Sequence, residues 1–124
     1  MNPVDLFSHE ANPVHLSPGE TLFNAGDSAD SMFVVLEGSV DILVNGKVVE
    51  NAKPGAIIGE MALIDPAPRG ATVVAHEIAK LARLDGHRFH RVIQQNPFFA
   101  THVMKVLVAR IRQMDKLYSG PGQA

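Results

Sequence analysis

Residues 40–49 read VDILVNGKVV, and this stretch predicts a β-hairpin. Both halves are rich in β-branched residues, which favour strands. Between the halves lies Asn45-Gly46, a pair that suits a type I′ turn because both central residues of that turn need a positive φ. The sequence therefore predicts two antiparallel strands joined at this turn.

Glycine and proline interrupt the chain at short intervals on both sides of the hairpin, from Val14 to Leu84. Helices of normal length do not fit between such breakers. The intervening segments are short and rich in β-branched or aromatic residues, and they cover residues 21–23, 32–36, 71–75 and 78–84. Many short strands with closely spaced turns are typical of a sandwich or barrel, so we predict a mainly β fold, a β-roll or jelly roll of about eight strands. This roll would span about residues 14–85, with one short helix inside it over residues 58–65.

The pattern becomes helical after Asp85. Residues 88–95 are amphipathic and end at Asn96-Pro97, where the residue before proline leaves the helical region. Residues 98–118 contain no glycine or proline and carry an apolar stripe at helical spacing, namely Val103, Leu107, Ile111, Met114 and Tyr118. We predict a short helix and a long C-terminal helix over about residues 87–118, within a single domain of residues 1–124.

Composition places the chain among globular proteins of one domain. It has 124 residues, of which 46% are hydrophobic and 19% charged, and it has no cysteine. Disulfides and cysteine-ligated metals are therefore excluded. We expect a soluble, cytoplasmic protein with no membrane partner, because no apolar run approaches the roughly 18 residues of a span and no secretory signal is evident.

Charge is distributed unevenly around a net value of −2. Residues 1–75 hold ten acidic and three basic residues, whereas residues 76–124 hold three acidic and eight basic residues. We interpret the basic half as a solvated helical face, and the alternative is a docking surface for an anionic partner.

The segment from Gly59 to Thr72 carries the most specific motif: Gly59-Glu60-Met61-Ala62-Leu63, followed by Arg69-Gly70-Ala71-Thr72. A glycine at the start of a short helix permits close approach, and the first amides of a helix favour an anion. Arg69 can grip a phosphate through two parallel bonds. Glu60 would repel that phosphate, so we expect it to face a hydroxyl donor beside the anion. A sugar phosphate supplies both groups.

This motif resembles the phosphate-binding cassette of the cyclic-nucleotide-binding domain family. That family provides the sensory module of cAMP-dependent kinase regulatory subunits, gated channels and bacterial catabolite-activator-type regulators. The resemblance extends over roughly residues 14–118, through the Ala25-Gly26-Asp27 turn, the segment from Phe33 to Val40 and the segment from Phe89 to Pro97. It implies a regulatory domain that binds a cyclic nucleotide and whose C-terminal helix moves towards the cassette.

The resemblance also implies roles for individual residues. Arg69 would pair with the cyclic phosphate, and Glu60 would accept the ribose 2′-hydroxyl. The full set of ligand-binding candidates is Gly59, Glu60, Met61, Ala62, Arg69, Gly70, Ala71 and Val73, with Met114, Leu117 and Tyr118 as a candidate lid. Ile58 stands where the family commonly has an aromatic residue. Gly70 lacks the hydroxyl that can assist guanine binding, so the expected ligand is cAMP rather than cGMP.

Other functions remain open at this stage. The cassette residues could be a surface arginine and a helix-end acid on a degenerate scaffold that serves as a protein-interaction module. A cupin-type metalloenzyme is disfavoured because the six histidines do not alternate along a strand, and His87 and His90 lack a third ligand. We therefore expect no enzymatic activity, no metal and no cofactor. DNA is not an expected partner, since few residues follow Tyr118; an effector protein, another domain of a longer chain or a second copy bound through the long helix is expected instead.

Overall fold

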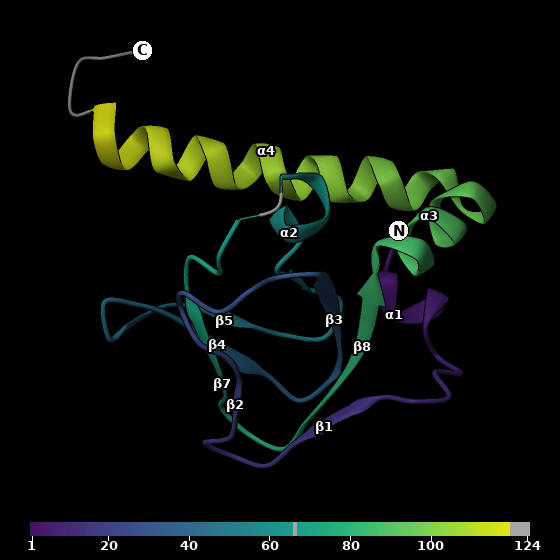
Figure 1. Cartoon of the computed structure of the whole chain (residues 1–124), viewed down its shortest axis with the longest axis horizontal. Coiled ribbons are helices and arrows are strands. Elements are labelled where there is room, and N and C mark those ends of the chain that lie inside the picture. Colours follow the sequence, from purple (N-terminus) through teal and green to yellow (C-terminus); the bar gives the residue numbers. More distant parts are fainter. Residues whose placement is uncertain (66, 120–124) are drawn as a thin grey trace.

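In the part of the chain that the structure describes, eight strands form two antiparallel sheets of four strands each (Figure 1). The computed structural model describes residues 1–65 and 67–119, and side chains only as far as residue 113. The first sheet has the order β1-β8-β3-β6 and the second the order β2-β7-β4-β5. The strands are β1 (Val14–Leu16), β2 (Thr21–Phe23), β3 (Ser31–Glu37), β4 (Val40–Val44), β5 (Lys47–Ala52), β6 (Ile57–Ile58), β7 (Thr72–Ala75) and β8 (Ala79–Asp85). The predicted β-roll is confirmed.

The hairpin of β4 and β5 turns where the sequence predicted. Asn45 and Gly46 both have positive φ, at 53° and 77°, and Val44 pairs with Lys47 across the turn. Strand β5 continues to Ala52, which is three residues further than its apolar part indicates. Strands β1 and β6 were not predicted because they are too short to show a period of two; their pairing with β8 and β3 defines them.

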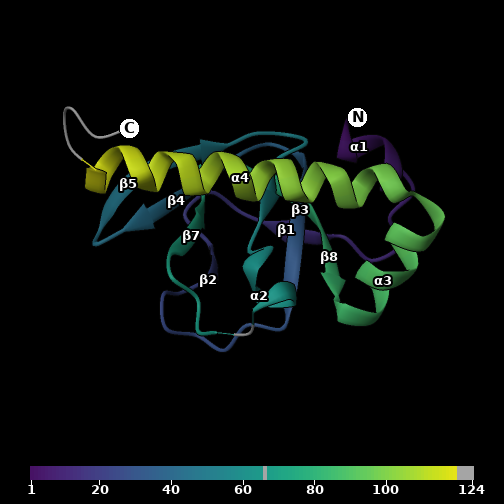
Figure 2. The same cartoon turned by 90° about the horizontal axis from the view of Figure 1, so that it is seen from above.

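The described residues also form four helices: α1 (Pro3–Leu6), α2 (Met61–Ile64), α3 (Gly86–Gln95) and α4 (Pro97–Ser119). Helix α4 passes along the roll, with α2 beneath its middle and α3 at its N-terminal end (Figures 1 and 2). The Asp85 carboxylate caps α3 by accepting the Arg88 N–H at 2.8 Å, and this bond lowers the pKa of Asp85. Both C-terminal helices begin and end within two residues of the predicted bounds. None of the described helices is long and apolar enough to cross a membrane.

Two apolar clusters hold these layers together. One fills the space between the sheets and is built around Val35, Val40, Val73 and Leu81. The other joins the β3–β8 side of the roll to α1, α3 and α4, where Phe99 meets Phe7 and Phe89 edge to face at centroid distances of 5.9 and 6.2 Å. This second cluster fixes the N-terminal part of α4 on the roll.

The apolar stripe predicted for α4 faces the roll at its start, but the prediction is wrong further along the helix. Val103 is buried and Leu107 packs against the second cluster. Ile111 is instead 57% exposed, because the inward face of the helix runs through Phe99, Val103 and Arg110 and turns Ile111 away from the roll. The position that faces the cassette is therefore occupied by an arginine.

Candidate functional site

Gly59 lies in the short turn between β6 and α2, two residues before the helix begins at Met61. This residue has φ of 73°, and a Cβ placed on it would collide with the guanidinium of Arg69. The positive φ favours glycine here, and any other residue would also displace the guanidinium of Arg69 from its position. The turn at Gly59 places Glu60 at the N-cap position of α2, the short helix that lies beneath α4 (Figure 1).

Glu60 is an almost fully buried carboxylate, with 1% of its surface exposed. Its Oε1 forms an ion pair with Arg110 of α4, and Arg110 also donates to the Ile57 carbonyl at 2.9 Å. Its second oxygen, Oε2, is buried and receives no hydrogen bond from the described residues. A buried carboxylate oxygen without a donor is costly, so the site is suited to a ligand that donates one hydrogen bond.

Arg69 lies on the other side of Gly59 and is also buried, at 9% exposure. Its guanidinium donates to the carbonyls of Ser31 at 2.6 Å and Gly59 at 3.2 Å. Burial lowers its pKa, while the charges of Asp30 and Asp27 act in the opposite direction. No carboxylate among the described side chains forms an ion pair with Arg69. Its positive charge therefore remains available to an anion.

The backbone of Arg69 is fixed by the loop between β2 and β3. Its N–H donates to the Asp27 carbonyl at 2.8 Å, and its carbonyl accepts from the Gly26 N–H at 2.7 Å. The Ala25 N–H donates to the Thr72 hydroxyl at 3.0 Å. Two segments that are far apart in the sequence thus hold Arg69 in place from its main chain.

The structure brings Gly59, Glu60 and Arg69 together and places the other ligand-binding candidates around them. Ala62 is buried, and its N–H donates to the Gly59 carbonyl within the helical turn. Met61 is 58% exposed and Gly70 is also at the surface, whereas Ala71 is half-buried and Val73 lies in the core between the sheets. The candidate lid residues Met114, Leu117 and Tyr118 fall outside the side chains that the structure describes.

Sequence reasoning missed Arg110 as a member of the site. The sequence did contain a signal for Arg110. This residue lies on the helix face of Val103 and Leu107, where the apolar stripe would be expected to continue with an apolar residue. A charged residue in an apolar stripe is expected to meet a buried partner. Ser31 was missed for another reason: it contributes its backbone carbonyl, which no side-chain pattern reveals.

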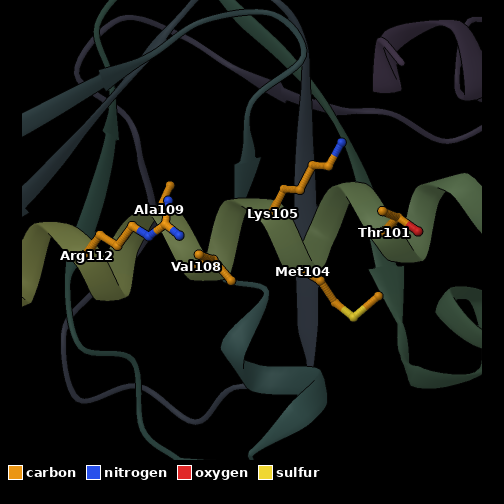
Figure 3. A pocket seen from close by; sticks show the side chains of 6 residues that line it. All are labelled: Thr101, Met104, Lys105, Val108, Ala109 and Arg112. Atoms are coloured by element: carbon orange, nitrogen blue, oxygen red, sulfur yellow. The ribbon is translucent and has the colours of Figure 1, made fainter.

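A shallow depression lies on α4 outside this site. All its lining side chains come from that one helix and spread to its two sides (Figure 3), namely Thr101, Met104, Lys105, Val108, Ala109 and Arg112. Neither Glu60 nor Arg69 contributes to it. Among the side chains that the structure describes, in residues 1–65 and 67–113, no three histidines or carboxylates come together in a way that could hold a metal ion.

The arrangement of an unpaired guanidinium beside a buried carboxylate agrees with the match of residues 13–96 to the family described as the cyclic nucleotide-binding domain. The chain belongs to the cyclic nucleotide-binding domain family. Part of an effector from Xanthomonas perforans, the Pycsar effector protein XpPycTIR, is 35% identical to it over 100 residues. That match covers 80% of this chain and 33% of the effector, so the chain spans about a third of this relative's length.

Solved members of the cyclic nucleotide-binding domain family share the fold. The catabolite activator protein of Thermus thermophilus is similar with a TM-score of 0.77 and 27% identity, over 90% of this chain and 55% of that protein. A cyclic nucleotide-binding domain from Methylobacillus flagellatus is similar with a TM-score of 0.71 and 26% identity, over 90% of this chain and 68% of that domain.

Proposed function

We propose that this domain is a sensor that binds a 3′,5′-cyclic nucleotide through Arg69 and Glu60 and has no catalytic activity of its own. The observation that carries the proposal is the presence of two buried groups on either side of Gly59 that lack partners among the described residues: a guanidinium with no carboxylate partner and a carboxylate with one oxygen that accepts no hydrogen bond. A ribose joined to a cyclic phosphate offers the matching groups, one anion and one adjacent hydroxyl donor.

The charge of the site favours a monoanion. Arg69 contributes one positive charge, and Glu60 already shares its negative charge with Arg110. A cyclic phosphodiester carries a single negative charge and satisfies Arg69, whereas a terminal phosphate adds a second negative charge for which the described side chains of the site offer no further unpaired cation. Linear nucleotides should therefore bind much more weakly.

The proposed base preference is for adenine over guanine. It rests on Gly70, which follows Arg69 at the surface and provides no hydroxyl for a guanine edge. A Cβ at Gly70 would meet no atom within 4 Å, so the position leaves room that glycine does not use. The preference is thus attributed to the missing donor and not to a steric barrier.

A melting-temperature screen with calorimetry tests the proposed function. The ligands are the cyclic forms of the four ribonucleotides, 2′-deoxy-cAMP and linear AMP. We expect cAMP to bind with micromolar or better affinity and to raise the melting temperature, since a ligand that binds only the folded state stabilises it. Linear AMP should have little effect. Absence of heat and of thermal shift with every cyclic nucleotide at millimolar concentration would refute the proposal.

Glu60→Gln tests the hydroxyl assignment. An uncharged amide accepts a hydrogen bond less strongly than a carboxylate, so the affinity for cAMP should fall by about 1 to 3 kcal/mol. 2′-Deoxy-cAMP lacks the donor and should bind the parent and the variant alike. Titration calorimetry with both ligands measures this difference. Equal losses for the two ligands would show that Glu60 does not meet the 2′-hydroxyl.

We infer that α4 carries the output of the domain. Arg110 connects this helix to Glu60, so a ligand that binds Glu60 would contact the same carboxylate that forms the ion pair with α4. The outer face of α4 exposes Met104, Val108 and Ile111 to solvent. No acidic residue occurs between Pro97 and Gln113, and a symmetric contact between two such faces would bring basic groups together. An acidic effector surface is therefore favoured over a second copy of the chain.

A further inference from the structure

Aromatic rings and backbone carbonyls surround the guanidinium of Arg69. Its Cζ lies over the ring of Phe23, 4.1 Å from the ring centroid, and 5.8 Å from the centroid of Phe33. Both distances fall within the roughly 6 Å at which a cation is attracted to the face of a ring. The two rings are neighbours, with centroids 6.1 Å apart. Phe23 makes the closer contact and lies at the end of β2.

The same stretch of chain fixes both ends of the Arg69 side chain. The loop after Phe23 binds the Arg69 backbone through Gly26 and Asp27, while the ring of Phe23 contacts the guanidinium. Carbonyls of Ser31 and Gly59 then set the rotation of the guanidinium. A long side chain that ordinarily samples many rotamers is thereby held in one position beside Gly59.

The chemistry of these contacts explains why a ring is useful at this point. A carboxylate would hold Arg69 equally well, but it would neutralise the guanidinium and compete with an incoming anion. A ring face attracts the cation through its quadrupole and leaves the net charge in place. Carbonyl oxygens do the same. The guanidinium can therefore be both ordered and fully charged before a ligand arrives.

We propose that Phe23 is a positioning residue for phosphate recognition, because it holds the Arg69 guanidinium where the phosphate would meet it; this rests on the proposed role of Arg69. Ordering the guanidinium in advance removes a conformational cost from ligand binding. Weakening the attraction of the ring should therefore weaken nucleotide binding, although Phe23 need not touch the ligand.

A fluorination series at position 23 tests the proposal with cAMP as the probe. Phe23 is replaced by mono-, di- and trifluorinated phenylalanine, which withdraw charge from the ring face with little change in size. The affinity for cAMP should fall stepwise, to a total on the order of threefold to thirtyfold. Phe23→Tyr should stay near the parent and Phe23→Leu near the weakest member. The same series at Phe89, a half-buried ring in the helical cluster, is the matched control and should leave affinity unchanged.

Two results would overturn the proposal. A flat affinity series at Phe23 would show that the ring does not act on binding, and a rising series would show that it holds Arg69 in a conformation that the ligand must break. A second measurement needs no ligand: the unfolding free energies of Phe23→Leu, Arg69→Met and the double variant should be non-additive, and additivity would exclude the contact. If no cyclic nucleotide binds the parent protein, the proposed function fails, and this cycle still decides whether the ring holds Arg69.

Discussion

Replacing Arg69 with alanine is expected to weaken cAMP binding by roughly 2 to 5 kcal/mol, at least about thirtyfold. The guanidinium is buried and forms no ion pair with the described carboxylates, so the proposed phosphate would be the negative charge that it pairs with. Titration calorimetry at fixed salt measures the change. Arg69→Lys should recover part of the affinity, because an ammonium keeps the charge but loses the two-point contact.

The control for this experiment is Arg83→Ala. Arg83 is a nearby arginine with an exposed side chain that pairs with Asp30 at 3.3 Å. The Arg83→Ala variant should bind cAMP with about the affinity of the parent protein, because exposed ion pairs contribute little free energy. Binding by Arg69→Ala within about threefold of the parent, in a variant that remains folded, would place the phosphate elsewhere.

Removal of the Arg110 side chain is expected to destabilise the protein even without nucleotide. Arg110→Met leaves the Glu60 carboxylate buried and without a partner, which should cost about 1 to 3 kcal/mol of unfolding free energy, less than for a fully buried pair because Arg110 is 31% exposed. Urea denaturation of the nucleotide-free protein measures this cost. The Arg110→Met substitution removes the ion pair that joins α4 to the cassette.

Two further variants distinguish the loss of this ion pair from a general destabilisation of α4. Arg112→Met changes an exposed arginine on the same helix and should be nearly neutral. Glu60→Gln combined with Arg110→Met removes both charges and should recover part of the stability lost in the single variant. If Arg110→Met and Arg112→Met unfold at the same urea concentration, Arg110 does not stabilise the buried carboxylate.

Much of the fold could be predicted because it depends on local patterns. The Asn45-Gly46 pair predicted its turn, and the absence of glycine and proline from Phe98 to Tyr118 predicted the long helix. Strand β6 could not be predicted, since two residues carry no periodicity and its partner β3 defines it. Ile111 was misplaced because spacing gives a helix face, whereas the direction of that face depends on what the helix packs against.

The residues of the cassette could be predicted from the sequence, whereas the residues that contact and order them could not. Gly59, Glu60 and Arg69 follow from one motif, and the structure brings them together. The contacts that order them come from distant parts of the sequence: Phe23 and Ser31 precede the cassette, and Arg110 follows it. No sequence pattern joins these positions, because the pairing of strands and the packing of α4 create the contacts.

The wide sequence separation of these contacts has a consequence for folding. The backbone bonds between Arg69 and Gly26-Asp27, and the ion pair between Glu60 and Arg110, each close a long loop, and such contacts form late because loop-closure entropy must first be overcome. During synthesis, a chain that ends before Arg110 would lack the cation that offsets the buried carboxylate. The Glu60 carboxylate thus gains its partner only after the C-terminal helix has docked, so we expect the cassette to reach its final form late in the folding of the chain.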